Sequence, residues 1–343
     1  MKRKIYLQLF ANANVQTTLL HATGNDLSPE MKTFYSDYLI DLAGPKLVHD
    51  QFAQKKPIPQ GSGKTIEFRQ YDSLPEALTP LTEGVTPDGN HLNVSTIEAT
   101  VEQYGDYITV SDMLKLTAID DNIVQATKIL GDQAGRTSDC ITRDILAAGT
   151  NVIYPNDKTS RATLATTDTL KPIDVEMAAT QLAAVNATTF EDGSYIAIIH
   201  PYVSFDLRTS SEFIDVHKYT DQGVNKVYDG EIGKLGNVRF VLSTNAKIWK
   251  AAADNCPTYE EGGETKPYAV FSTLVLGADA YGVTEVEGGG LQTIIKQLGS
   301  GEDPLNQRAS VGWKLTKTAE RLVEQYMVRI ETLSKYSKKA TAN

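Results

Sequence analysis

Residues 72–93 form a long polar segment with three prolines and two glycines, set between two stretches that alternate like strands. The first stretch, residues 65–71, alternates the apolar Ile66 and Phe68 with polar neighbours. The second stretch covers residues 95–104. A compact domain rarely contains a structureless loop of this length unless the loop has a function. The pattern therefore predicts an extended two-stranded arm with a turn-rich tip.

Apolar side chains on this arm lack an evident partner within the arm itself. They are Leu74, Leu78, Leu81, Val94 and Ile97. An isolated two-stranded ribbon has no core in which to bury them. We therefore hypothesise that these five residues pack against adjacent copies of the chain. The alternative is a loop that folds back on its own domain and buries them within one copy.

A long amphipathic helix is predicted for residues 121–148, because apolar and small residues recur there every three or four positions. These residues are Ile123, Ala126, Leu130, Ala134, Thr137, Ile141, Ile145 and Ala148. Such a helix would span about 40 Å. Gly131 and Gly135 each cost a helix about 1 kcal/mol relative to alanine, which predicts close contact with another element at these positions.

The remaining sequence alternates between helical and strand-like patterns. Helices are predicted at residues 28–42, 172–187 and 201–207. Strands are predicted at residues 194–199, 238–242, 269–276, 310–317 and 323–330. Residues 230–236 are rich in glycine and predict a turn in which glycines supply positive φ. The fold class that follows is α+β.

Composition restricts the classes of partner. The 343-residue chain has a formal net charge of −10, whereas a protein that grips nucleic acid presents a basic face to the phosphates. An acidic chain is compatible with a container for DNA, because a wall that bound DNA tightly would hinder packing. Cys140 and Cys256 belong to no CxxC pair, which favours synthesis in a reducing cytoplasm. No run approaches the roughly 20 apolar residues that span a membrane.

The sequence Gly61-Ser-Gly-Lys-Thr65 ends like a phosphate-binding loop. That motif requires a glycine where this chain has Ile58, and a helix after the loop where a strand is predicted here. A nucleotide-binding enzyme that uses Gly61 to Thr65 is therefore the disfavoured alternative to a flexible turn.

No other pattern points to catalysis. The five histidines are scattered without an HExxH motif, and no GxSxG sequence is present. The sequence predicts no catalytic residue, no cofactor, no metal site and no enzyme activity.

Four short motifs follow one another along the second half of the chain. Their positions are His200 and Pro201, then Gly230, Glu231 and Gly233, then Asp303, Pro304, Asn306 and Gln307, then Gly312 and Trp313. Each motif alone is weak, but their order and spacing resemble the major capsid proteins of tailed bacteriophages. That fold is shared with encapsulin shells and with the floor of herpesvirus capsids. The resemblance covers roughly residues 28–335.

The resemblance implies a tailed-phage major capsid fold with five segments. They are an N-terminal arm at 1–45, an extended two-stranded E-loop with its flanking strands at 46–110, a P-domain with a long spine helix at 111–167, an A-domain at 168–298, and a return to the P-domain with a C-terminal tail at 299–343. The N-terminal segment is shorter than a fused scaffold requires, and residues 72–93 contain no lysine for cross-linking. A separate scaffold, if any, and non-covalent locking are therefore expected.

The resemblance also implies function and partners. The chain is expected to assemble with itself as hexamers and pentamers into an icosahedral virion shell around double-stranded DNA, without sequence-specific binding. Assembly is expected in the bacterial host cytoplasm, away from membranes, with a portal protein and separate scaffolding and decoration proteins as further candidate partners. The alternative within this fold is an encapsulin-type compartment. The basic start, Lys2, Arg3 and Lys4, is expected to face inward or to bind a neighbour's acidic surface.

Overall fold

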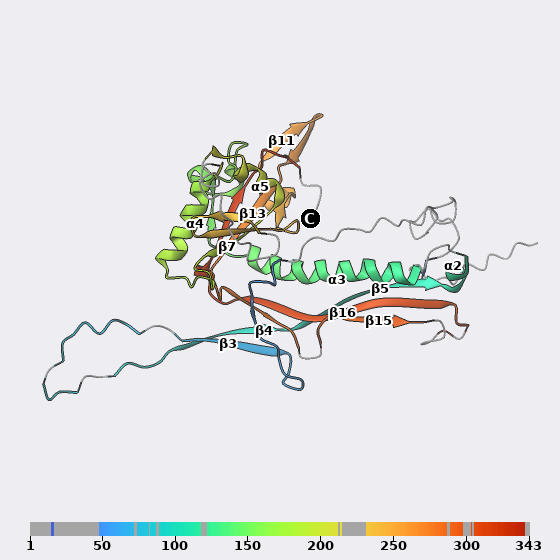
Figure 1. The fold of residues 1–343 in the computed structure, drawn as a ribbon, viewed down its shortest axis with the longest axis horizontal. Helices are drawn as coiled ribbons and strands as arrows, with labels where there is room; N and C mark the ends of the chain where they lie inside the picture. The colour runs from blue at the N-terminus through green and yellow to red at the C-terminus, as the bar shows by residue number, and fades with distance from the viewer. Residues whose placement is uncertain are drawn as a thin grey trace, which may run out of the picture.

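Two β-sheets and a long helix make up the body of the molecule, and a two-stranded arm projects from it (Figure 1). The computed structural model describes residues 15–16, 48–71, 74–81, 83–86, 89–117, 122–211, 213–214, 231–286, 289–297, 303 and 305–339. The helix predicted at residues 28–42 lies outside these residues. Within the described ranges, no helix is long and apolar enough to cross a membrane.

The first sheet has seven strands in the order β6-β17-β13-β7-β9-β8, with β10 paired to β13. The strands are β6 (Val152–Ile153), β7 (Tyr195–Ile199), β8 (Glu231–Leu235), β9 (Val238–Leu242), β10 (Ile248–Trp249), β13 (Val270–Leu276) and β17 (Met327–Thr332). Every residue of β7 and β13 is buried. Apolar-rich strands without alternation are typical of sheets covered on both faces. Strands β7 and β13 confirm the strands predicted at residues 194–199 and 269–276.

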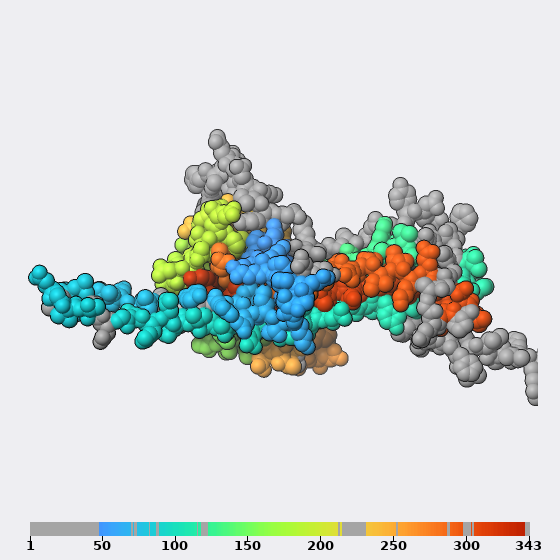
Figure 2. Space-filling view, turned by 90° about the horizontal axis from the view of Figure 1, so that it is seen from below, coloured from blue at the N-terminus to red at the C-terminus, as the bar shows by residue number. Residues whose placement is uncertain are grey.

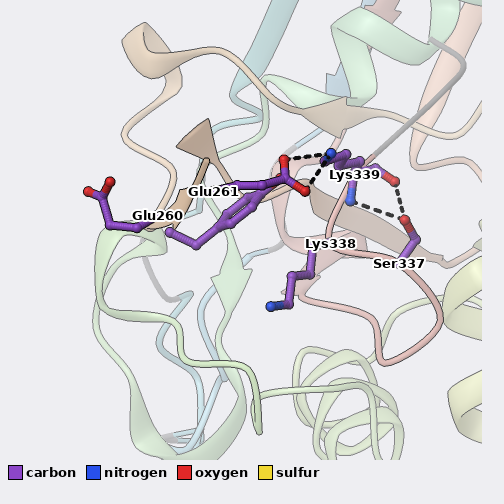
Figure 3. Close-up of a pocket in the computed structure, with 6 residues that line it drawn as sticks. Glu260, Glu261, Ser337, Lys338 and Lys339 are labelled. Carbon is purple, nitrogen blue, oxygen red and sulfur yellow. Dashed lines mark hydrogen bonds and ion pairs between the residues drawn. The ribbon is translucent and has the colours of Figure 1, made fainter. Parts of the chain in front are cut away.

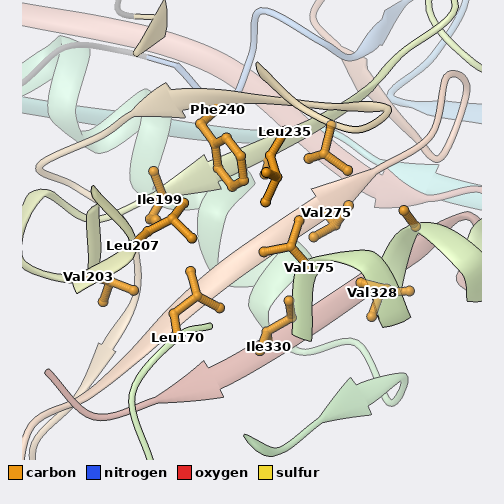
Figure 4. Packing of buried hydrophobic residues seen from close by; sticks show 14 of the residues in the cluster. Leu170, Val175, Ile199, Val203, Leu207, Leu235, Phe240, Val275, Val328 and Ile330 are labelled. Atoms are coloured by element: carbon orange, nitrogen blue, oxygen red, sulfur yellow. The ribbon is translucent and has the colours of Figure 1, made fainter. Parts of the chain in front are cut away.

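Helix α4 (Pro172–Ala184) packs on one face of this sheet (Figure 4). Val175 of the helix lies in the same buried cluster as Val275 and Val328 of the sheet. Burying each such side chain contributes about 1.5–3 kcal/mol. The helix ends earlier than predicted, and Asn186 just beyond it has a left-handed φ of 54°, which a right-handed helix cannot include.

Helix α5 (Pro201–Arg208) begins at the end of β7, and His200 is its N-cap. The Nδ1 atom of His200 accepts a hydrogen bond from the backbone N–H of Tyr202 at 3.2 Å. The ring is also packed against Phe271, with 5.0 Å between ring centroids. Burial lowers the pKa of His200 to about 4, so the imidazole is neutral in the folded protein at pH 7.

We predict that His200→Asn makes the protein less sensitive to mild acid. Unfolded histidine binds a proton near pH 6.5, whereas folded His200 does so only near pH 4, so the wild type loses stability as pH falls from 6.5 to 4. The loss reaches about 2–3 kcal/mol by pH 4.5. Asparagine keeps an N-cap acceptor but does not titrate. Urea unfolding at pH 7.0 and 4.5, in a non-assembling background, should show that His200→Asn loses less free energy of unfolding between these two pH values than the wild type does. An equal loss in the two proteins would contradict the prediction.

The second sheet has six strands in the order β1-β5-β16-β14-β2, with β15 paired to β16. The strands are β1 (Val15–Gln16), β2 (Gln54–Lys55), β5 (Glu102–Ser111), β14 (Tyr281–Thr284), β15 (Gln292–Lys296) and β16 (Arg308–Arg321). The fourteen-residue β16 is its central strand, because it pairs with β5 along one side and with β15 and β14 along the other.

Helix α3 (Asn122–Ala147) lies along the second sheet and confirms the predicted long helix (Figure 1). Its face with Ala126, Leu130 and Ala134 packs on Val311, Trp313 and Leu315 of β16 in one cluster. These three residues of β16 are at alternate positions, as expected for a strand with one covered face. A side chain at Gly131 would meet no atom within 4 Å, so the predicted close contact at this glycine is wrong for the single chain.

The described residues contain several shorter elements. They are α2 (Asp112–Thr117), the hairpin of β11 (Thr258–Glu261) and β12 (Glu264–Pro267), and the 3-10 turns η2 (Pro155–Asp157), η3 (Arg161–Thr163), η4 (Ala252–Asp254) and η5 (Glu324–Tyr326). Turn η5 occupies the first half of the strand predicted at residues 323–330, so that strand begins only at Met327.

The turn predicted at residues 230–236 is wrong for most of its length, because β8 occupies residues 231–235. Gly236, with φ of 56°, makes the turn into β9. Glu231 is buried in β8, and its carboxylate accepts a hydrogen bond from Arg239 of β9 at 2.7 Å. That pairing allows a charged residue to occupy a buried strand position.

The sheets divide the chain differently from the predicted segments. Strands β14 and β15 precede residue 298, yet both pair with β16 of the second sheet. Strand β17 follows residue 298, yet it pairs with β13 of the first sheet. The predicted A-domain at 168–298 and the seven-stranded sheet therefore overlap without coinciding, and the segment boundaries stay a prediction.

A buried polar cluster joins α3 to the segment that precedes the arm. One carboxylate oxygen of Asp139 accepts hydrogen bonds from the backbone N–H groups of Val48 and His49 at 3.0 and 2.9 Å. The other oxygen lies 2.8 Å from His49 Nδ1 and 2.7 Å from the side-chain nitrogen of Asn245. Burial alone would raise the pKa of Asp139, but His49 and the other donors outweigh it and hold that pKa below its usual value.

Lys317 of β16 completes the connection, although it is only 3% exposed. Its amine forms an ion pair with Asp50 and donates to the backbone oxygen of Ser138 at 2.8 Å. Asp50 also accepts a hydrogen bond from Thr142 of α3. Burial lowers the pKa of Lys317, and the nearby carboxylate of Asp50 offsets part of that effect. Residues 48–50 are therefore fixed to both the helix and the second sheet.

Candidate assembly surface

The arm consists of β3 (Thr65–Tyr71) and β4 (Val94–Thr100), which pair antiparallel from Thr65↔Thr100 to Tyr71↔Val94. The two strands confirm the predicted ribbon. The predicted return strand at residues 95–104 is split, because Val101 separates β4 from β5 of the second sheet. The arm is therefore continuous with the body at β5.

The arm is anchored at its base by Phe68. This side chain is 6% exposed, and a Cβ at Gly282 of β14 would lie 2.9 Å from its ring. A larger residue at position 282 would force the Phe68 ring out of its place. The sequence did not predict this contact, since Phe68 and Gly282 are more than two hundred positions apart and neither belongs to a motif.

The apolar residues predicted to pack on other copies are largely exposed in the single chain. Leu74, Leu78, Leu81 and Val94 are 52%, 81%, 78% and 46% exposed, and Ile97 is half-buried on the ribbon. The described part of the tip also exposes Val85 and Leu92, at 63% and 72%. These two residues were not singled out from the sequence, although their apolar character in a polar loop was the available signal.

The tip extends away from the body instead of folding back on it (Figures 1 and 2). All described residues between 74 and 93 are exposed. Exposed apolar side chains in a row this long are unusual for a soluble monomer and mark an interaction surface. The packing of Leu74, Leu78, Leu81, Val94 and Ile97 on adjacent copies stays a prediction.

The described motif residues of the first sheet lie at the start of α5 and in β8, where they support the fold. His200 caps α5, and Pro201 is the first residue of that helix, where its missing N–H costs nothing. Glu231 and Gly233 lie in β8. Gly230, the remaining residue of this motif, lies outside the described residues.

The motif residues of the second sheet shape the turn into β16 and the helix contact. Asp303 accepts a hydrogen bond from the backbone N–H of Arg308 at 2.7 Å, and Asn306 between them takes a φ of 56°. The backbone oxygen of Gln307 accepts a hydrogen bond from the backbone N–H of Asp112 at 3.0 Å. The indole N–H of Trp313 donates to the side-chain oxygen of Gln133 in α3 at 3.2 Å.

Gly312 lies on β16 beside β5. A Cβ there would lie 2.9 Å from Cβ of Tyr107, so this glycine allows close strand contact. Pro304 and the basic residues Lys2, Arg3 and Lys4 lie outside the described residues. The structure does not bring the motif positions together at one site, and those described support the two sheets separately.

The segment from Gly61 to Thr65 is a turn that leads directly into β3. Gly61 and Gly63 have φ values of 82° and 86°, which suit glycine alone among ordinary residues. A phosphate-binding loop needs a helix N-terminus at this point, whereas the residues described here continue as a strand. Among the described residues, no group of three or more His, Cys, Asp and Glu side chains is arranged to hold a metal ion.

Comparison with known proteins agrees with this architecture. A family model described as phage capsid protein matches residues 94–316, which is more than half of the chain. This chain belongs to the phage capsid protein family. The predicted resemblance to tailed-phage major capsid proteins is thereby confirmed, and the chain is a structural subunit of a virion shell. No curated protein sequence matches it.

Solved capsid structures share the fold of this capsid protein at low sequence identity. The capsid of Ralstonia phage GP4 has a TM-score of 0.68 and 17% identity, and the match covers 94% of this chain and all of that one. The capsid of cyanophage P-SCSP1u has a TM-score of 0.63 and 16% identity, with 91% and 96% covered. The capsid of cyanophage Pam1 has a TM-score of 0.61 and 13% identity, with 89% and 98% covered. The predicted α+β tailed-phage capsid fold is confirmed.

Proposed function

We propose that this capsid protein forms hexamers and pentamers that close into an icosahedral shell around double-stranded DNA, and that it catalyses no reaction. The observation that carries the proposal is the projecting arm, whose leucines at positions 78 and 81 are about four-fifths exposed in one copy. Such an arm gains stability only when other copies cover it.

The energy of such a shell comes from many modest contacts. Burial of apolar surface contributes about 25 cal/mol per Å², and ordering and desolvation reduce the net value for each pair of copies. Each subunit of a closed shell makes several such contacts at once. Weak pairwise binding is therefore compatible with a stable particle.

The acidic balance of the chain supports enclosure of DNA without sequence-specific binding. A net charge of −10 gives no general attraction to phosphates, so DNA can move past the wall during packing. A portal protein and separate scaffolding and decoration proteins are proposed as further partners, and the bacterial host cytoplasm as the place of assembly. No lysine lies in residues 72–93, which supports non-covalent locking of the shell.

Two other functions are weighed against this one. An encapsulin-type compartment has the same fold, but the match to a phage capsid family favours the virion shell. A nucleotide-binding enzyme would have to use the turn from Gly61 to Thr65, where a strand follows in place of the required helix. Absence of ATP binding to the purified protein would dismiss this second alternative.

Electron microscopy of the purified protein tests the proposal directly. Negative-stain images over a range of protein concentrations should show closed shells or capsomer rings. Dispersed single subunits at every concentration, with and without candidate scaffolding proteins from the same genome, would refute it.

A further inference from the structure

The two ends of the arm carry opposite charge. The tip, residues 72–93, has four carboxylates and no lysine or arginine. The root, residues 54–64, has three lysines and no carboxylate. Glu76 and Glu83 of the tip and Lys55 and Lys56 of the root are all exposed. Attraction between such surfaces gives an interface its register and excludes wrong arrangements.

The root is held rigidly along the edge of the second sheet. Strand β2 pairs with β14, so that Lys55 lies opposite Val283. The backbone N–H of Lys56 donates to the backbone oxygen of Val283 at 3.2 Å, and that of Ile58 donates to the backbone oxygen of Glu285 at 2.9 Å. The lysines therefore project from a fixed backbone. Figure 2 shows the root and the start of the arm in blue, next to the cyan outer part of the arm.

A cavity of about 170 Å³ opens at the root, with Lys55, Lys56 and Lys317 in its lining. Asp50 and Glu285 also line it. Lys317 and Asp50 form an ion pair with each other. Lys55 and Lys56 supply the remaining positive charge, and Glu285 offsets one of these two charges, so the lining is positive by one charge overall. In the part of the chain that the structure describes, no salt bridge joins either amine to a carboxylate.

A second cavity with lysines in its lining is less suitable (Figure 3). It lies between the β11–β12 hairpin and the C-terminal residues, and it contains Lys338 and Lys339. Glu261 already forms an ion pair with Lys339 at 2.6 Å. The amine of Lys338 lies 5.5 Å from the centre of the Tyr259 ring. Lys56 has a similar ring contact, 5.9 Å from the centre of the Phe68 ring, so this contact does not distinguish the two cavities. The difference is that Glu260 and Glu261 also line the second cavity and balance the charge of its two lysines.

We propose that the acidic tip of one copy's arm docks on the lysine-lined root of the next copy's arm. Seven residue pairs of ribbon separate the tip from Lys64 of its own chain, roughly 20 Å along the strands. The amine of Lys56 lies 5.9 Å from the ring of Phe68, halfway along the ribbon, and the tip extends away from both lysines. The ribbon keeps the two ends apart, so the contact forms between copies. This inference rests on the proposed shell function and adds the place where the tip lands.

Tip-to-root docking is a head-to-tail contact, because it joins two different surfaces. A contact of this kind generates a ring when the rotation between copies closes. Leu78 and Leu81 lie between the two acidic positions Glu76 and Glu83, so their apolar surface would be covered by the same contact. The attraction between the tip carboxylates and the root lysines would align neighbouring copies, and burial of the two leucines would stabilise the ring.

Charge reversal tests this pairing in the full-length protein. Lys55→Glu with Lys56→Glu reverses the root, and Glu76→Lys with Glu83→Lys reverses the tip. Each double variant should raise the lowest protein concentration that gives shells at least about tenfold, equivalent to about 1.4 kcal/mol per subunit. The variant with all four substitutions restores opposite charges at the tip and the root. Its lowest protein concentration for shells should lie within about threefold of the wild-type value. Sedimentation and electron microscopy measure both effects.

Matched controls separate this pairing from other effects of charge. Glu260→Lys with Glu264→Lys makes the same charge change as the tip reversal, but on the exposed β11–β12 hairpin, and should assemble normally. Melting curves should show that every variant folds. The inference would be overturned by any of three results: normal assembly of either reversed variant, no rescue when all four substitutions are combined, or an equal loss of assembly in the hairpin control. A wild type that forms no shells, with or without candidate scaffolding proteins, would instead refute the proposed function.

Discussion

A chain that lacks residues 80–90 will fold to a soluble subunit and will form no shells. The deletion removes the outer part of the tip, including Leu81 and Val85, which are 78% and 63% exposed. It leaves β3, β4 and both body sheets intact. The stability of the single subunit should stay within about 0.5 kcal/mol of the wild type, since surface changes away from structural features have small effects. Assembly should be lost at every concentration tested.

The matched control is Thr79→Ala with Thr86→Ala, which alters the same exposed loop but keeps its leucines and carboxylates. This variant should form normal particles. Circular dichroism and melting midpoints establish that both variants are folded, and electron microscopy scores the particles. Normal shells from the deletion variant would show that the tip is dispensable.

Asp139→Ala should destabilise the subunit by about 3–5 kcal/mol, the usual effect of removing one partner from a buried ionic cluster. Asp139 is 1% exposed and accepts from two backbone N–H groups, from His49 and from Asn245. Alanine would leave these donors buried without an acceptor. Guanidinium unfolding of the non-assembling deletion variant, with and without the substitution, measures the difference.

Two further substitutions sharpen that measurement. Asp139→Asn keeps the shape and one acceptor oxygen, so its effect should fall between wild type and alanine. Asp132→Ala, on the same helix at a half-buried position, should cost less than about 1 kcal/mol. Equal effects at positions 132 and 139 would mean that the buried cluster does not fix residues 48–50 to the helix.

Local patterns in the sequence were enough to predict the elements that carry the fold. The three-and-four spacing of apolar residues predicted α3, and apolar-rich stretches predicted β7 and β13. The arm was predicted from two signals. Its strands alternate apolar and polar residues, and its tip is a long polar segment with prolines and glycines. Its exposed leucines followed from the lack of anything nearby to cover them.

Elements that depend on distant partners could not be predicted. Strand β8 contains a buried glutamate, and only Arg239 on the next strand makes that burial possible. Asp139 and Lys317 look like surface residues in the sequence, because their partners His49 and Asp50 lie far away along the chain. The Phe68–Gly282 contact at the base of the arm likewise joins residues that lie far apart in the sequence.

Hydrogen exchange at the arm tests most directly whether the tip is covered by other copies. Amides of the described tip residues 74–81 and 89–93 should exchange almost freely in the isolated subunit, because these residues are exposed there. In assembled shells the same amides should become protected by at least about tenfold, while amides of β7 and β13 are protected in both states. Equal exchange at the tip in free subunits and in shells would contradict the account.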